Sequence, residues 1–382
     1  MEQLSCPGNG ARRRGLPCEN LDAVARKWLN PHQDTNLNFI MMEATQMAYK
    51  FAAGVWCDNP GASRFGEATR TARTIEERIK AYKKLGLSGI EAHDNEITSK
   101  MAPEIKKLLD RTRMRVALYT ANFFWNKKYT NGALASHDPK VRKEAVEQLK
   151  RAIDTAHVLE ADVLVYWNGQ EGQDVAFGKD GVEALGYLRD AFNEALEYDA
   201  TNYGDKAIPV AIEPKPNEPR CSMLLPTVGD AIAFSYSLDP RYQAKVGVNP
   251  EVAHSIMVGL DYTKDIETAF FHNKLFHIHL NDQEGPKYDQ DLPFAAVNAK
   301  RGLEIIACLK HNDYRGWVSF DLNPLRTDAE DKRNNIIKAC MANFKTLSAI
   351  ADRLDWNKIK RFRRAGDFSG LDMYIDSVLL SA

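Results

Sequence analysis

Short β-branched runs alternate with long amphipathic stretches along most of this chain. Eight such runs are candidate strands: Phe51–Trp56, Ser88–His93, Arg115–Thr120, Asp162–Trp167, Ile208–Glu213, Ala244–Val248, Lys274–Leu280 and Trp317–Leu322. Alternation of this kind favours a parallel sheet whose strands are joined by crossover helices.

The stretches between the runs carry helix signals. The segment Thr74–Leu85 opens with Thr74 and, three residues later, Glu77, which is the spacing of a capping box, and Gly86 follows it. The segments Lys140–Leu159 and Val182–Tyr198 place apolar residues at helical spacing and charges elsewhere. The pattern therefore predicts helices between the strands and another after the eighth.

Eight strands with intervening helices favour a closed (β/α)8 TIM barrel in the α/β class. An open doubly wound sheet usually carries a Gly-rich phosphate loop after its first strand, whereas here the first strand runs into Trp56-Cys57-Asp58-Asn59. We expect a catalytic barrel over residues 46–353, a polar N-terminal extension over residues 1–45 with one helix near Leu21–Leu29, and a short C-terminal helical arm over residues 354–382.

Composition and charge narrow the class of protein. Apolar residues make up 44% and charged residues 27%, and the net charge is −1, which gives no general attraction to nucleic acid or to an acidic membrane. The basic runs Arg12–Arg14 and Lys358–Arg364 are interpreted as solvated faces. No apolar run of about 18 residues predicts a membrane span. The N-terminus lacks the apolar core of a secretory signal, so we expect a cytoplasmic protein.

Six scattered cysteines without a C-x-x-C pair predict free thiols rather than disulfides or a zinc site. Cys57 lies at a strand end, but no base stands at a fixed offset from it. We therefore expect it to be a buried thiol and not a nucleophile.

Candidate chemistry lies at the carboxyl ends of the last four strands, which meet on one face of a barrel. Glu213 and Lys215 are two residues apart, so both side chains point into the barrel mouth. Glu251 and His254 follow the sixth strand and lie on the same side of one helical turn that Pro250 begins.

The seventh and eighth strands add His279, Asp289, Asp291 and Asp321. Each residue alone would be read as a helix cap or a satisfied polar group. Five carboxylates in one small volume, however, repel one another unless cations neutralise them. Hard oxygen ligands with one or two imidazoles predict Mg²⁺, Mn²⁺ or Co²⁺.

Around these residues the chain reads VAIEPKPNEPRCSMLLPT from Val210, VGVNPEVAH ending at His254, LFHIHLN ending at Asn281 and KYDQDLPF ending at Phe294. These four strings resemble, in order, motifs of the xylose isomerase family. Upstream, Trp56, RFGEATR (64–70), His93-Asp94, Thr120-Ala121-Asn122 and Tyr166-Trp167 fall in the expected order. The resemblance covers roughly residues 50–350. It implies a tetrameric barrel that interconverts an aldose, D-xylose or a similar sugar, with its ketose by ring opening and a metal-assisted 1,2-hydride shift.

The resemblance also implies roles for individual residues. The first of two divalent ions would be held by Glu213, Glu251, His279 and Asp321, and the second by Glu251, His254, Asp289 and Asp291, with Glu251 bridging. His93 would assist ring opening and Lys215 would bind the carbonyl oxygen on C1. The predicted substrate-binding residues are Trp56, Phe65, Thr120, Phe124, Trp167 and Asn249. Phe65 reaches a neighbouring subunit in the family, so at least a homodimer is expected.

The chain departs from the family at three positions in or next to these motifs and in the length of its C-terminal arm. His279 replaces an Asp, which removes one negative charge and favours Mn²⁺ or Co²⁺ over Mg²⁺; rhamnose isomerases and ketose 3-epimerases place a His at the matching strand. Glu96 replaces the Asp that follows the ring-opening His by three residues, and Asp94 is an alternative orienting group. Asn323 replaces a Lys. The C-terminal arm is about 40 residues shorter than in the family's longer forms.

Two other functions stay open at this stage. One is a related metal-dependent sugar epimerase, or a lyase acting on a modified sugar, reached through the change at His279. The other is a catalytically silent sugar- or metal-binding barrel. His93, Lys215 and the complete second metal set favour the isomerase.

Overall fold

The computed structural model describes residues 49–61 and 66–381. Its parallel strands are β1 (Lys50–Gly54), β2 (Gly89–His93), β3 (Arg115–Thr120), β4 (Leu164–Trp167), β6 (Val210–Glu213), β8 (Val246–Val248) and β9 (Trp317–Phe320). They form a seven-stranded sheet in the order β8-β6-β4-β3-β2-β1-β9. A separate antiparallel pair, β5 (Gly172–Gln173) and β7 (Ser222–Met223), lies in the loops.

The ring is closed by the segment that was predicted as the seventh strand, Lys274–Leu280. Leu275 pairs with Val248 of β8, and His279 pairs with Ser319 of β9, both in parallel. Both pairings are isolated bridges. On the β8 side the neighbouring chain includes Pro250, which has no N–H to donate to a ladder. The predicted barrel is therefore confirmed, with an irregular seventh member.

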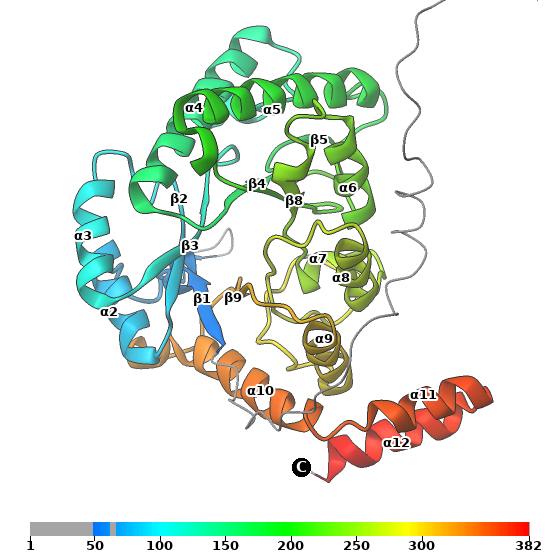
Figure 1. Cartoon of the computed structure of the whole chain (residues 1–382). Helices are drawn as coiled ribbons and strands as arrows, with labels where there is room; N and C mark the ends of the chain where they lie inside the picture. Colours follow the sequence, from blue (N-terminus) through cyan, green and yellow to red (C-terminus); the bar gives the residue numbers. More distant parts are fainter. Residues whose placement is uncertain (1–48, 62–65, 382) are drawn as a thin grey trace, which may run out of the picture. The chain divides into compact units, whose positions relative to one another are not determined.

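Helices surround the strands, as Figure 1 shows. They are α2 (Ile75–Leu85), α3 (Ala102–Thr112), α4 (Pro139–Leu159), α5 (Gly181–Tyr203), α6 (Val228–Ser237), α7 (Val252–Met257), α8 (Tyr262–Phe271), α9 (Ala299–His311) and α10 (Asn335–Ala351). Short 3-10 turns occur at Val55–Asp58, Lys127–Tyr129, Gly204–Lys206, Gln243–Lys245 and Glu330–Lys332. In the part of the chain that the structure describes, no helix has the length and apolar character needed to cross a membrane.

The C-terminal arm consists of α11 (Trp356–Ala365) and α12 (Phe368–Leu380), which pair with each other beyond the end of α10 (Figure 1). Lys300 of α9 forms ion pairs with Asp372 and Asp376 of α12, at 2.6 and 2.7 Å. The arm thus contacts the barrel of its own chain. The predicted extension over residues 1–45, its helix near Leu21–Leu29 and the basic run Arg12–Arg14 lie outside the described residues.

The barrel interior is closed at the amino ends of the strands by Trp317. A Cβ added to Gly89 would lie 2.8 Å from the Trp317 ring, so this close approach requires glycine. The Trp317 indole donates a hydrogen bond of 2.7 Å to Asp162. With this end filled by an aromatic ring, polar side chains gather at the opposite end of the strands.

The first strand ends two residues earlier than predicted. After Gly54 the chain turns into a 3-10 helix, and the Trp56 ring folds back over Gly54, where a Cβ would lie only 2.1 Å away. Gly54 thus allows the turn that places Trp56 at the barrel mouth.

The described cysteines, Cys57, Cys221, Cys308 and Cys340, are free thiols, as predicted. The thiol of Cys57 is buried and lies 3.6 Å from the Phe320 carbonyl oxygen. Burial raises its pKa well above the ordinary value, so the nucleophilic thiolate is disfavoured. Cys6 and Cys18 lie outside the described residues.

The predicted capping box at the start of α2 is present, and it supports a stability test. The Thr74 hydroxyl accepts from the Glu77 N–H at 3.3 Å, and Glu77 accepts from the Thr74 N–H at 2.8 Å. We predict that Thr74→Ala lowers the free energy of unfolding in urea by about 1 kcal/mol, whereas Thr74→Ser, which keeps the acceptor, changes it by less than half as much. Equal losses in both variants would contradict a capping role.

Candidate metal centre and sugar site

A cavity of about 270 Å³ opens at the carboxyl ends of the strands. It is lined by Trp56, His93, Leu118, Thr120, Phe124, Val165, Trp167, Glu213, Lys215, His254, His279, Asp289, Asp291 and Asp321. The residues predicted from four separate strand ends therefore share one cavity. One wall of it is aromatic, and the other carries carboxylates and imidazoles.

The four residues predicted to hold the first metal form one group, in which one ligand atom of each lies within 4.8 Å of the others. They are Glu213, Glu251, His279 and Asp321. The Nδ1 atom of His279 is 3.2 Å from Glu213, 3.5 Å from Glu251 and 3.9 Å from Asp321. Asp321 also accepts a hydrogen bond of 2.6 Å from the Trp56 indole. We call these four residues the first metal group.

A second group consists of Glu251, His254 and Asp289. The Nε2 atom of His254 lies 3.2 Å from a carboxylate oxygen of each of the other two. Asp291, predicted as a fourth member, is not brought into this group; its carboxylate accepts from the Asn281 amide at 3.0 Å. Glu251 is the residue that the two groups share.

Several polar atoms of these groups are buried without a hydrogen-bond partner, namely Glu251 Oε2, His254 Nδ1 and Asp289 Oδ1. Burial and the charges of Asp289 and Asp321 raise the pKa of Asp291 well above its ordinary value. Buried acceptors left unpaired are costly, and crowded carboxylates repel. Both features fit a site that binds divalent cations through oxygen and imidazole ligands.

The ring of His93 lies at the aromatic wall. Its centroid is 4.6 Å from the centroid of the Trp56 ring and 5.6 Å from that of the Phe124 ring. Its Nδ1 atom is 3.0 Å from Glu96 Oε2, so Glu96 is the orienting group. Burial lowers the pKa of His93, but the Glu96 carboxylate outweighs this effect and raises it.

Asp94, the alternative orienting group, has a different role. It accepts from the Asn122 N–H at 3.0 Å and from the Gln148 amide at 2.7 Å, and it thereby fixes the loop after β3. Of the two candidate orienting groups, Glu96 is the one that contacts the His93 ring, because the turn after β2 brings it back, with its N–H 3.0 Å from the His93 carbonyl.

The remaining predicted substrate residues have mixed outcomes. Phe124 and Trp167 stack edge to face at 4.6 Å in the cavity wall. Thr120 lines the cavity, but its hydroxyl donates to the Val165 carbonyl at 2.7 Å. Asn249 does not line the cavity, and its amide donates to Glu213 at 2.8 Å; its contact with the sugar stays a prediction. Phe65 lies outside the described residues.

Lys215 is buried between the carboxylates and the aromatic wall. Its ammonium donates to Asp289 at 2.6 Å and lies 5.5 Å from the centre of the Trp167 ring. Burial lowers the pKa of Lys215, but the charges of Asp289 and Glu251 outweigh it, so the lysine stays protonated.

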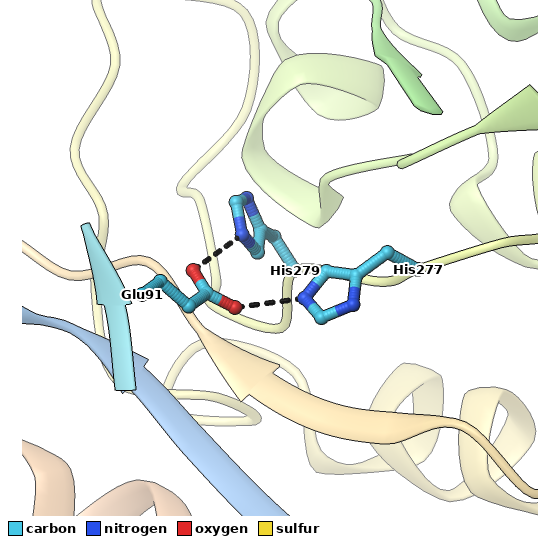
Figure 2. A group of neighbouring side chains, drawn as sticks. All are labelled: Glu91, His277 and His279. Carbon is cyan, nitrogen blue, oxygen red and sulfur yellow. Dashed lines mark hydrogen bonds and ion pairs between the residues drawn. The ribbon is translucent and has the colours of Figure 1, made fainter. Parts of the chain in front are cut away.

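One buried residue beside the first metal group, Glu91, was not predicted from the sequence. It lies in β2, is fully buried, and contacts both His277 and His279, as Figure 2 shows. The signal was present, because Glu91 and His93 are two residues apart in one strand and therefore face the same side.

Comparison with known proteins agrees with this geometry. A family model described as xylose isomerase-like TIM barrel matches residues 79–340. The xylose isomerase of Thermus thermophilus is 33% identical over 315 residues, which cover 80% of each protein.

Solved structures with the same fold include two sugar epimerases. The D-psicose 3-epimerase of Clostridium cellulolyticum H10 has a TM-score of 0.60 and 13% identity, covering 78% of this chain and 99% of that one. The 3-keto-D-glucoside 4-epimerase of E. coli has a TM-score of 0.58 and 14% identity, covering 79% and 100%. At these identities the likeness concerns the fold alone. The family match and the Thermus relative lead to one assignment: this chain belongs to the xylose isomerase-like TIM-barrel family.

Proposed function

We propose that this protein is a metal-dependent aldose–ketose isomerase that acts on D-xylose or a similar aldose by ring opening and a 1,2-hydride shift. The observation that carries the proposal is a cavity lined by His93, by Lys215 and by members of two ligand groups that share Glu251. The T. thermophilus relative, named a xylose isomerase, supports the same substrate class.

Two divalent cations are the proposed cofactors, held by the first metal group and by Glu251, His254 and Asp289, with Asp291 at the edge of the second set. When bound, they supply the positive charge that stabilises an oxyanion on the sugar and polarises its carbonyl. The imidazole of His279 among the ligands favours Mn²⁺ or Co²⁺ over Mg²⁺.

His93 is proposed to move the proton that opens the sugar ring. Because Glu96 holds Nδ1 at 3.0 Å, the other ring nitrogen is left for the substrate. Contact with Trp56 and Phe124 on the aromatic wall keeps the ring in place.

Lys215 is proposed to donate a hydrogen bond to the carbonyl oxygen at C1. Its protonated state suits this task, since a fixed positive charge in a buried cavity stabilises charge that develops on oxygen. Trp56, Phe124 and Trp167 exclude water from the same cavity, which protects a migrating hydride.

The N-terminal segment that includes Phe65 is proposed to reach the cavity of a neighbouring subunit in a homodimer or homotetramer. The family resemblance of the RFGEATR string is the basis for this assignment.

An epimerase is the second candidate, and His279 is the observation that favours it. Epimerisation by proton transfer at carbon uses two glutamates on opposite sides of the sugar. Among the described residues that line the cavity, Glu213 is the only glutamate, and it belongs to the first metal group. The cavity therefore favours the hydride shift.

Removal of the shared ligand tests the site directly. We predict that Glu251→Ala lowers kcat/KM for aldose turnover with Mn²⁺ by a factor of about 1,000 or more, equivalent to about 4 kcal/mol of transition-state stabilisation. Cys57→Ala, a change in a buried thiol outside the cavity, retains most of the activity. A Glu251→Ala protein as active as the parent would contradict the assignment.

The path of the hydrogen is a separate test. When the reaction runs in D₂O, a direct shift carries the original hydrogen from C2 to C1, so mass spectrometry or NMR of the ketose finds no deuterium at C1. Deuterium incorporated during each turnover would reject the hydride shift in favour of proton transfer through solvent.

Cation binding is expected to weaken below neutral pH. Burial, together with the charges of Glu251 and Glu213, raises the pKa of Asp321 to about 7. A raised pKa means that the proton is held below pH 7, and the cation must displace it. Each pH unit below 7 therefore lowers Mn²⁺ affinity at the first group by about tenfold or more, measured by calorimetry at pH 5.5, 6.5 and 7.5. An affinity that is constant over this range would contradict the protonation argument.

A further inference from the structure

Behind the first metal group lies a buried network centred on Glu91. One carboxylate oxygen of Glu91 is 2.7 Å from His277 Nε2, and the other is 2.9 Å from His279 Nε2. The Ser319 hydroxyl donates to the oxygen that faces His277. Figure 2 shows the carboxylate lying between the two imidazole rings. All four side chains are buried.

This arrangement fixes the orientation of the His279 ring. An ionised carboxylate only accepts hydrogen bonds, so the Nε2 atom, 2.9 Å from Glu91, carries a hydrogen. The Nδ1 atom then faces Glu213, Glu251 and Asp321 at 3.2 to 3.9 Å. The Asn249 amide lies 3.3 Å from the same Nδ1. Because Nε2 keeps its hydrogen on Glu91, Nδ1 is the atom that would bind a cation in the first metal group.

The charges point in the same direction. An imidazole at position 279 brings no negative charge, whereas a carboxylate there would bring one. Glu91 places one carboxylate directly behind the imidazole, at hydrogen-bond distance. A carboxylate bound to the far nitrogen of a ligand histidine fixes its tautomer and makes the ring a stronger donor to a cation. Glu91 and His279 together can thus replace one carboxylate ligand.

We propose that Glu91 is a positioning residue of the first metal group and that it sets the cation affinity there through His279. This inference rests on the cation binding in the proposed function, but not on which sugar reacts. Two other roles for Glu91 give different results in the test below. One is a purely structural ion pair, and the other is a ligand of a third cation together with His277 and His279, whose ligand atoms also lie within 4.8 Å of one another.

The test is Mn²⁺ binding to the metal-free full chain, measured by calorimetry and by electron paramagnetic resonance. We expect two Mn²⁺ ions per chain. Glu91→Gln should lower the affinity for one of these ions by about 10- to 100-fold and change the affinity for the other by less than about threefold. Three Mn²⁺ ions per chain, unchanged affinities in Glu91→Gln, or an equal loss at both sites would overturn the proposal.

Asp58→Asn is the matched control for loss of a buried carboxylate. Asp58 is fully buried and is paired with Arg333 at 2.9 Å and with Arg73 at 2.8 Å, in contact with neither metal group. The Asp58→Asn variant should have a lower thermal unfolding temperature and unchanged affinities for both Mn²⁺ ions. A loss of Mn²⁺ affinity as large as that of Glu91→Gln would assign the effect to general destabilisation and overturn the proposal.

The His279→Asp background tests whether Glu91 acts through His279. In that variant a carboxylate can reach the cation directly, and Glu91 loses its imidazole partner. Glu91→Gln should then have no cost in Mn²⁺ affinity, or should raise it by removing a repelling charge. A loss of the same size in both backgrounds would show that Glu91 acts independently of His279 and would overturn the proposal.

Mn²⁺ binding and aldose turnover, measured on the same Glu91→Gln protein and on the parent, separate the role of Glu91 from the proposed isomerase activity. Normal aldose turnover with unchanged Mn²⁺ affinities in Glu91→Gln refutes the role of Glu91 and leaves the isomerase standing. The expected Mn²⁺ pattern without turnover of any aldose refutes the isomerase and leaves the role of Glu91 standing.

Discussion

Mutual repulsion of carboxylates in a buried space is the constraint on which this site depends. Glu213, Asp289, Asp291 and Asp321 line one cavity, Glu251 lies within 4.8 Å of ligand atoms of Glu213, Asp289 and Asp321, and the ammonium of Lys215 pairs with Asp289 at 2.6 Å. Such a set is stable only with compensating positive charge or with bound protons. The raised pKa values of Asp291 and Asp321 reflect that need. The proposed divalent ions would meet it and would supply catalytic charge as well.

The barrel creates this concentration of charge by closing one end and leaving the other polar. Trp317 fills the interior at the amino ends of the strands, over Gly89. At the carboxyl ends, the irregular seventh member carries His277 and His279, and its isolated pairings with β8 and β9 bring His279 beside Glu251 and Ser319. The break in regular strand pairing thus coincides with the place where the two proposed cation sites meet.

Much of the fold follows from local patterns, and so do the metal groups. The strand positions came from apolar runs, and the start of α2 came from the Thr74–Glu77 capping spacing, which the structure reproduces. The convergence of carboxylates at strand ends follows from barrel geometry. What local pattern could not supply was the direction of single side chains after a strand ends. Asn249 faces the ligands rather than the cavity, and Glu96 rather than Asp94 turns back to His93. Glu91 was missed for another reason, since its partners lie 186 and 188 residues away in the chain.

Whether Glu251 joins two cation sites can be seen by anomalous X-ray diffraction from a crystal soaked with Mn²⁺ and D-xylose. We expect two manganese peaks on either side of the Glu251 carboxylate, one next to His279 and one next to His254, with the sugar between them and His93. A crystal loaded with manganese but without an ion in contact with Glu251 would contradict this expectation.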